Sequence, residues 1–105
     1  MVVMEVLTLN GTNFDETILN ALPVIVDFYA DWCGPCKRVA PIITQLAKEN
    51  EGKIIFCKLN VDDCPEIAAR YSIQSIPALI SFKNGKVHKT MVGVQSSQKI
   101  LELAD

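Results

Sequence analysis

The chain has 105 residues, of which half are apolar, and its formal net charge is −2. This length and apolar content predict one globular domain over residues 1–105, because the chain is long enough for one core and too short for two. Its ten basic and twelve acidic residues are scattered rather than gathered in a stripe, so no polyanion-binding face is expected and nucleic acid is excluded as a partner.

The first part of the chain predicts a strand, a short helix and a second strand. Residues 4–9 alternate between apolar and polar side chains, as a strand does. Asn13 and Glu16 form a capping-box pattern, which predicts the start of a short helix. The apolar run at 23–30 predicts the second strand.

A long helix is predicted from about Cys33 to Asn50, because apolar side chains recur there at helical spacing. Pro41 lies inside this segment and should kink the helix, since proline removes an internal hydrogen bond. Gly52 suits the C-terminal cap of the helix. Residues 53–60 predict a third strand.

The remaining residues predict a short helix, a hairpin and a last helix. The segment Asp63-Cys64-Pro65-Glu66 caps a short helix that runs to about residue 71. Asn84-Gly85 predicts a tight turn between strands at 78–83 and 86–92. Residues 96–104 predict the last helix.

The order of these elements decides the fold class. Strand–helix–strand units require parallel strands, whereas a hairpin requires antiparallel strands. The predicted fold is therefore α/β, with a central mixed β-sheet of about five strands flanked by about four helices on both faces.

Two cysteines stand one helical turn apart in Trp32-Cys33-Gly34-Pro35-Cys36-Lys37. Residues three apart on a helix are neighbours, so the two sulfurs can close and reopen a disulfide with little rearrangement. Cys33 comes first, at the helix N-terminus, where free N–H groups and the helix dipole favour the thiolate. We expect Cys33 to be the more exposed sulfur and to attack a target disulfide, and Cys36, one turn deeper, to resolve the mixed disulfide.

Asp27 stands in the middle of the apolar strand before this motif. Burial disfavours the ionised form of a carboxyl group, so the pKa of Asp27 should be raised. A buried acid beside the cysteines can accept the proton of Cys36. The alternative is a hydrogen-bonded buried acid without a catalytic part.

The motif residues, preceded by Val26-Asp27-Phe28-Tyr29-Ala30-Asp31, resemble the signature of the thioredoxin family. The resemblance extends over essentially the whole chain, with Tyr29 where many members have a second Trp. It implies the thioredoxin fold and a protein-disulfide reductase, or dithiol electron carrier, that works without a bound cofactor or metal. It also implies a monomer that is recycled by a thioredoxin reductase and acts on disulfide-containing target proteins. Later segments that match the family are Lys58-Leu59-Asn60-Val61-Asp62, Ser75-Ile76-Pro77, Phe82-Lys83-Asn84-Gly85 and Val92-Gly93.

The resemblance further implies a surface for target proteins. The Ile76–Pro77 bond would be cis and face the cysteines, and the backbone of Ile76 would pair with an extended target segment; an ordinary trans bond is the alternative. Lys58 would reach towards Asp27 if their strands are adjacent, although a surface lysine is an equal alternative. The expected docking face is flat and apolar and consists of Trp32, Gly34, Pro35, Val61, Ile76, Pro77, Val92 and Gly93.

Three other residues carry weaker signals. Cys57 lies in an apolar strand and is predicted to be a small core residue, although a zinc site that combines it with Cys64 and the two motif cysteines is an alternative. Cys64 opens a short helix, so it is either an exposed regulatory thiol or a passive residue. His88 is expected to be exposed and receives no role.

The cysteine count also bears on the cellular compartment. Residues 1–5 lack the basic and apolar regions of a secretory signal, and the apolar stretches are too short to span a membrane. A reducing compartment, by default the cytoplasm, is therefore expected, with no membrane partner.

A disulfide oxidase or isomerase is disfavoured because no cation separates the two motif cysteines. A non-catalytic binding subunit is disfavoured because both cysteines and Asp27 are present.

Overall fold

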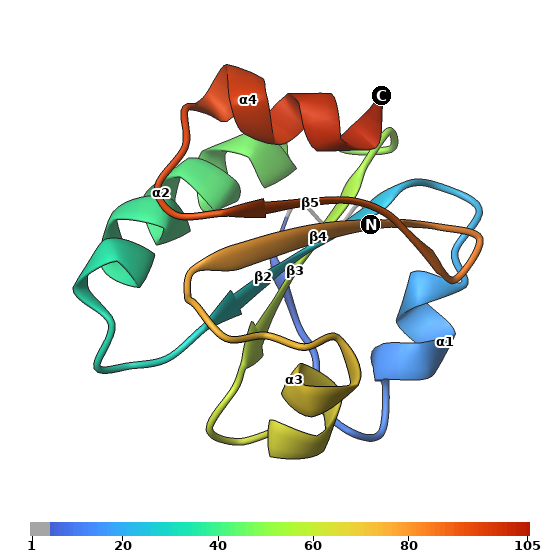
Figure 1. Cartoon of the computed structure of the whole chain (residues 1–105). Helices are drawn as coiled ribbons and strands as arrows, with labels where there is room; N and C mark the ends of the chain where they lie inside the picture. The colour runs from blue at the N-terminus through green and yellow to red at the C-terminus, as the bar shows by residue number, and fades with distance from the viewer. Residues whose placement is uncertain (1–4) are drawn as a thin grey trace.

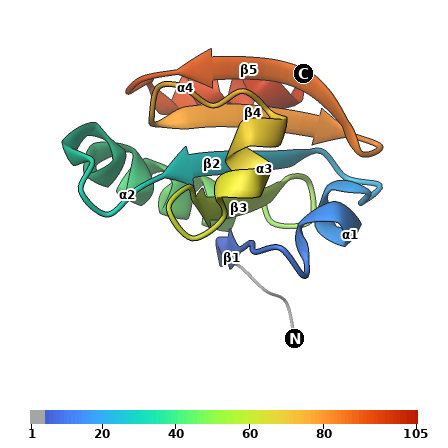
Figure 2. The ribbon, with the colours of Figure 1, turned by 60° about the horizontal axis from the view of Figure 1, so that its bottom comes forward.

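The computed structural model describes residues 5–105. Five strands form one sheet in the order β1-β3-β2-β4-β5, as Figures 1 and 2 show. The strand β3 is parallel to β1 and β2, whereas β4 is antiparallel to β2 and β5, which confirms the predicted mixed sheet. The strands are β1 Leu7–Thr8, β2 Val24–Tyr29, β3 Ile55–Asn60, β4 Ala78–Lys83 and β5 Lys86–Val92.

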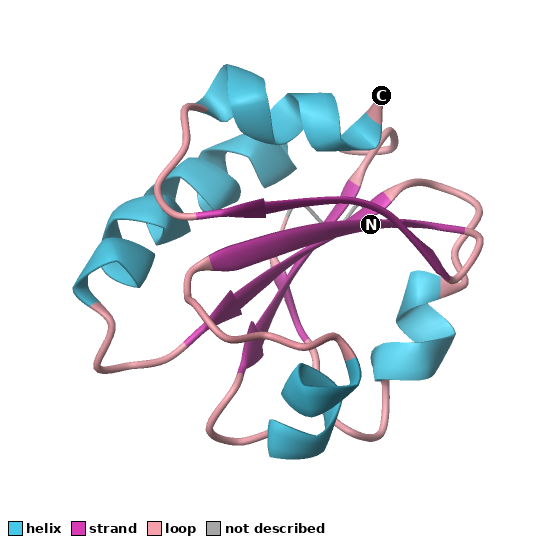
Figure 3. Cartoon of the chain, in the orientation of Figure 1, coloured by secondary structure: helices cyan, strands magenta, loops and turns pink. Residues whose placement is uncertain are grey.

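Helices cover both faces of the sheet (Figure 3). The helices α2 and α4 lie on one face, and α1 and α3 lie on the other (Figure 1). This arrangement confirms the predicted α/β fold. The helices are α1 Phe14–Ile18, α2 Gly34–Glu49, α3 Pro65–Arg70 and α4 Ser97–Leu101, which a 3-10 turn continues over Glu102–Ala104. None of the helices within residues 5–105 has the length and apolar character needed to cross a membrane.

The two faces of the sheet bury two separate apolar clusters. Along β2, Val24, Val26 and Phe28 pack with residues of α1 and α3. Ile25 packs on the opposite face with residues of α2 and α4. Because successive strand side chains alternate between faces, Asp27 and Tyr29 follow Ile25 and point to the side of α2.

The first strand is shorter than the predicted 4–9, of which residue 4 lies outside the described residues. Only Leu7 and Thr8 pair with β3, and the Leu9 amide adds one more bond to the carbonyl of Lys58. At Asn10 the chain turns, because the Asn10 side chain accepts the amide protons of two residues that follow it. A side chain that closes a local turn competes with strand pairing.

The predicted capping box at the start of α1 is wrong, although the helix is present. The Asn13 side-chain oxygen accepts the amide proton of Asn10, which precedes the helix, instead of an amide within it. The cap of α2 also differs from the prediction. That helix runs through Pro41 and ends at Glu49. Its C-cap is Asn50, whose amide bonds to the carbonyl of Leu46, while Gly52 lies in the turn beyond with φ +79°.

The hairpin between β4 and β5 has the predicted bounds. Its turn residues Asn84 and Gly85 have φ of 56° and 80°, the left-handed values that an Asn-Gly turn supplies. Gly85 also needs to lack a side chain, because a Cβ there would lie 2.6 Å from the Leu19 side chain. The Gly85 amide donates to the carbonyl of Ile18, so the turn also holds the end of α1.

Candidate active site

The cysteine pair lies where β2 leads into α2. Cys33 is the N-cap of α2, and Cys36 lies in its first turn. The two residues are joined by a disulfide, with their Cα atoms 5.3 Å apart. The strand, the turn and the helix start therefore bring the two sulfurs together as the spacing of three predicts.

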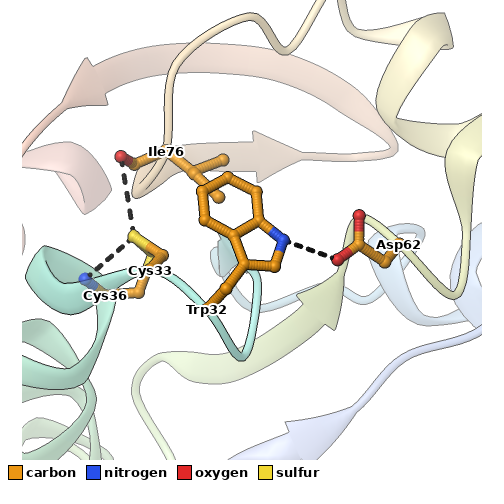
Figure 4. The surroundings of a disulfide bond; sticks show 5 residues. All are labelled: Trp32, Cys33, Cys36, Asp62 and Ile76. Atoms are coloured by element: carbon orange, nitrogen blue, oxygen red, sulfur yellow. Dashed lines mark hydrogen bonds between the residues drawn. A yellow bond between two sulfur atoms is a disulfide. The ribbon is translucent and has the colours of Figure 1, made fainter.

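The surroundings of the Cys33 sulfur come from α2 and from the loop before β4. The amide of Cys36 donates a hydrogen bond to Cys33 Sγ over 3.2 Å (Figure 4). The carbonyl oxygen of Ile76 lies 3.8 Å from the same sulfur, within reach of a reduced thiol. An amide donor and a helix N-terminus both stabilise negative charge, so reduction of the disulfide leaves Cys33 in a place suited to a thiolate.

The predicted difference in exposure between the two cysteines is absent. Cys33 is 4% exposed and Cys36 is 3% exposed. Both are buried because Tyr29, Val61 and Ile76 pack around the pair. The two sulfurs differ instead in what they face: Cys33 faces the Ile76 carbonyl, whereas Cys36 lines a cavity that also borders Asp27.

That cavity has a volume of about 160 Å³ and lies between β2, β3 and the start of α2. Its walls hold Asp27, Cys36 and Lys58, together with Tyr29, Ala30, Asp31, Lys37 and Ala40. Asp27 and Lys58 are paired in the register of β2 and β3. The two strands are therefore adjacent, which is the condition under which Lys58 is expected to reach towards Asp27.

Asp27 is the one acidic residue buried within residues 5–105, with 4% of its surface exposed. Its Oδ1 atom has no hydrogen-bond partner among the described residues. Burial raises the pKa of Asp27 from 3.8 to about 7, and the nearby positive charge of Lys58 opposes this rise. At neutral pH the carboxyl group is close to half ionised, so it can both accept and return a proton.

The residues of the expected docking face, Pro77 apart, are exposed or half-buried. Trp32 and Val92 are 71% and 57% exposed, and Gly34 and Pro35 are exposed beside them. Val61, Ile76 and Gly93 are half-buried. These residues come from four separate segments of the chain, and folding brings them together.

The Ile76–Pro77 bond is cis, as the resemblance implied. Pro77 itself is buried, so its side chain adds no exposed surface to the expected docking face. The Pro77 carbonyl accepts the amide proton of Gly93 over 2.9 Å. Pro77 thus determines how the backbone runs before β4, while Ile76 next to it remains partly exposed.

Two features of the site escaped the sequence analysis. The indole Nε1 of Trp32 donates to Asp62 Oδ2 over 2.8 Å (Figure 4), which holds the exposed ring against the loop after β3. Tyr29 lines the cavity beside Asp27. A signal for Tyr29 was present, because residues two apart on a strand share a face; no local pattern links residues 32 and 62.

The other two cysteines lie away from this site. Cys57 and Cys64 belong to the apolar cluster under α1 and α3, whereas Cys33 and Cys36 form a cluster of their own. The zinc alternative is therefore wrong, and residues 5–105 hold no group of three or more metal-ligating side chains arranged around one point. Cys64 is buried, which fits the passive residue of the two alternatives and not the exposed regulatory thiol. His88 is exposed as expected, with Nε2 at 2.8 Å from the Asp105 carbonyl oxygen.

Known proteins resemble this chain in sequence and in structure. A family model described as Thioredoxin matches residues 5–105. The chain is 44% identical over 105 residues to the chloroplastic thioredoxin M5 of Oryza sativa subsp. japonica, over 99% of this chain and 61% of that protein. It is 44% identical over 92 residues to a thioredoxin of Rickettsia felis, over 87% of this chain and 88% of that protein.

A solved structure agrees with these sequence matches. A mutant thioredoxin from Halobacterium salinarum superposes with a TM-score of 0.90 at 30% identity, over 99% of this chain and 91% of that chain. The chain spans 61%, 60% and 51% of the lengths of the chloroplastic relatives from rice, wheat and spinach. Since the family model matches nearly the whole chain and the fold agrees, this chain belongs to the thioredoxin family.

Proposed function

We propose that this protein is a protein-disulfide reductase that carries electrons as a dithiol and passes them to disulfides in target proteins. The observation that carries the proposal is the Cys33–Cys36 disulfide at the start of α2, beside a cavity that holds the buried Asp27. A pair of cysteines in this setting can alternate between dithiol and disulfide without moving the helix.

Cys33 begins the reaction in the reduced protein. Its thiolate attacks one sulfur of the target disulfide, and the other target sulfur leaves as a thiolate, which takes up a proton from water. The products are a mixed disulfide between Cys33 and the target, and one free target thiol. The Cys36 amide that donates to Cys33 Sγ supports this role, because it stabilises the attacking anion.

Cys36 completes the reaction. Asp27 accepts the Cys36 proton, and the resulting thiolate attacks Cys33 Sγ, forms the Cys33–Cys36 disulfide and expels the second target thiolate. Lys58 stabilises the Asp27 carboxylate before it takes the proton, since its positive charge lowers the pKa of that group. One target disulfide has then been reduced by two electrons from the cysteine pair.

Target proteins dock on the face around the disulfide. Trp32, Val61, Ile76 and Val92 supply apolar surface, Gly34, Pro35 and Gly93 allow close approach, and Pro77 shapes the backbone before β4. The free backbone groups of Ile76 suit the addition of an extended target segment as a short strand. A small face of this kind fits brief encounters with many proteins.

The proposal includes partners that complete the cycle. A thioredoxin reductase returns the disulfide to the dithiol, and the protein acts as a monomer. We also propose a reducing compartment as its place of action, the cytoplasm by default. The relatives include both a bacterial thioredoxin and chloroplastic proteins, so fractionation with an antibody would test the compartment directly.

The experiment that tests the function is reduction of insulin in the presence of a dithiol reductant. The protein should accelerate the precipitation of the insulin B chain above the rate with the reductant alone. Cys36→Ser should trap target proteins as mixed disulfides that a reductant releases, because the resolving thiol is missing. No acceleration by the wild type, or no trapped protein with Cys36→Ser, would contradict the proposal.

A further inference from the structure

Tyr29 occupies a position at the site that the reaction described above does not use. It is the last residue of β2, two residues after Asp27, and so it points to the same side of the sheet. Both side chains line the cavity that Cys36 also borders. The phenol ring packs against the cysteine pair as well.

The Asn60 side chain fixes how the phenol group can bond. Asn60 is the register partner of Tyr29 on β3. Its Oδ1 atom accepts the amide protons of Asp62 and Asp63, over 2.8 and 3.3 Å. The oxygen is therefore engaged in the turn after β3, and the amide group of Asn60 is left to donate to the Tyr29 oxygen, in keeping with the lowering of the Tyr29 pKa by Asn60. The Tyr29 proton is then free for another acceptor.

The Tyr29 hydroxyl stays protonated at neutral pH. Burial and the charge of Asp31 raise its pKa, the Asn60 side chain lowers it, and the charges of Asp63 and Asp27 raise it further. Tyr29 is thus a neutral donor that lines the same cavity as Asp27. Asp27 lines a cavity of about 160 Å³, and each water molecule occupies about 30 Å³ of liquid.

We propose that Tyr29 is a positioning residue for the resolving step, and that its hydroxyl donates a hydrogen bond into the cavity and orders water that hydrogen-bonds to the Asp27 carboxyl group. Hydrogen bonds that run from the Tyr29 hydroxyl through water to Asp27 stabilise the Asp27 carboxylate, which is the form that accepts the Cys36 proton. The proposal rests on the proposed function, since it concerns the proton transfer within that reaction. Tyr29 itself neither gains nor loses a proton in the cycle.

Several charged groups act on Asp27 from the elements that pack around it. Lys58 on β3 and Lys37 on α2 carry positive charge, and Asp31 after β2 carries negative charge. Cys36 on α2 is the other titrating group of the cavity. None of these is altered by Tyr29→Phe, which keeps the ring and removes only the hydroxyl. The variant therefore separates hydrogen bonding from the shielding of the cavity by the ring.

The test measures two quantities in Tyr29→Phe. The first is the pH midpoint of Asp27, followed by the ¹³C chemical shift of its carboxyl carbon in the reduced protein. The second is the rate of mixed-disulfide resolution as a function of pH, in stopped-flow with a disulfide-bonded peptide. Loss of one hydrogen bond weakens the stabilisation of the Asp27 carboxylate about fivefold, so the midpoint should rise by about 0.7 pH unit. Resolution at pH 7 should then slow about threefold, because the ionised fraction of Asp27 falls from about one half to about one sixth.

The first attack by Cys33 should keep its rate, because it does not involve Asp27. Tyr71→Phe is the matched control: it removes the hydroxyl of the other tyrosine, which packs against the cluster under α1 and α3, and it should leave the midpoint and both rates unchanged. An unshifted midpoint in Tyr29→Phe, or equal slowing of attack and resolution, overturns the role of Tyr29. Absence of any resolution in the wild type overturns the proposed function as well.

Discussion

Cys33 and Cys64 occupy the same local position in two different parts of the molecule. Each is the N-cap of a helix, and in each helix a proline lies within the first two positions. Cys33 Sγ accepts an amide proton of its own helix, whereas the Cys64 side chain makes no such capping bond. Cys33 packs with Cys36 beside the proposed docking face, and Cys64 is packed among the apolar residues under α1 and α3.

This comparison shows that a helix start alone does not make a cysteine reactive. Burial, together with the charges of Asp63 and Glu66, raises the pKa of the Cys64 thiol, and a bond from the Gly11 backbone only partly offsets this rise. Burial without any helix start raises the pKa of Cys57 to about 12. What sets the first site apart is an amide donor to the sulfur, a second cysteine one turn away and a buried acid beside it.

The largest effect should follow from Cys33→Ser. Insulin reduction should fall to the rate of the reductant alone, because no attacking thiolate remains. Turnover with a limiting amount of protein is the measurement. Substantial remaining turnover would show that another cysteine makes the attack. Cys33 would then no longer differ from Cys64 in reactivity.

Removal of the buried acid should change stability strongly and with pH. The pKa of Asp27 is about 7 in the folded protein and 3.8 in the reference state, so between these values the folded state holds a proton that the unfolded state has lost. The wild type should therefore lose stability as the pH rises from about 4 to 7. Asp27→Asn should abolish this slope and raise the free energy of unfolding at pH 8 by up to about 4 kcal/mol.

Urea unfolding at pH 5 and pH 8 checks this expectation. A parallel series on Cys64→Ser is the control, since that variant keeps Asp27 and should keep the slope. Equal slopes in the wild type and in Asp27→Asn would mean that the fold does not disfavour ionisation of Asp27.

The same substitution should slow one step of catalysis and spare the other. In Asp27→Asn the Cys33 attack should proceed nearly as in the wild type, while resolution should slow by about a hundredfold, the effect of losing a general base. Stopped-flow measurement of both steps at pH 7 separates them. Unchanged resolution would show that Cys36 loses its proton to another acceptor.

A positive charge next to Cys33 should raise the reduction potential of the Cys33–Cys36 disulfide. Pro35→His places a titratable cation beside the thiolate, stabilises the reduced form and makes the disulfide more oxidising. A shift of about 30 mV corresponds to about 1.4 kcal/mol and a tenfold change in the equilibrium constant. Equilibration against glutathione at pH 6 should show this rise, and a potential that falls or stays constant would contradict the electrostatic explanation.

The smallest effect is expected at Cys64. Because burial and the charges of Asp63 and Glu66 raise the pKa of its thiol, mild oxidation of the reduced wild type should yield the Cys33–Cys36 disulfide and no dimer linked through Cys64. Cys64→Ser should keep full turnover, and Cys57→Ser should do the same. A non-reducing gel that shows a dimer in the wild type, and none in Cys64→Ser, would place Cys64 at the surface. The cysteines at both helix starts would then be reactive.

Most of the fold was predictable because its signals are local. The Asn84-Gly85 turn needs left-handed backbone at two successive residues, and few residue types supply it. The long helix repeats its apolar residues at helical spacing, so its bounds were correct within a residue. The predictions that failed concern ends and caps: the Asn13 side chain bonds backwards to Asn10, a choice that the residue types alone leave open.

The sequence by itself determined the chemistry of this protein: the spacing of Cys33 and Cys36 puts two sulfurs one turn apart at a helix start, and an acid in an apolar strand has a raised pKa. Only the tertiary structure decided what surrounds them. The cavity that Asp27 and Cys36 share with Lys58, the bond from Trp32 to Asp62 and the packing around Cys64 all bring together segments that are far apart in the chain. Local spacing reports on neighbours within a turn or across a strand, whereas these contacts depend on how whole elements pack.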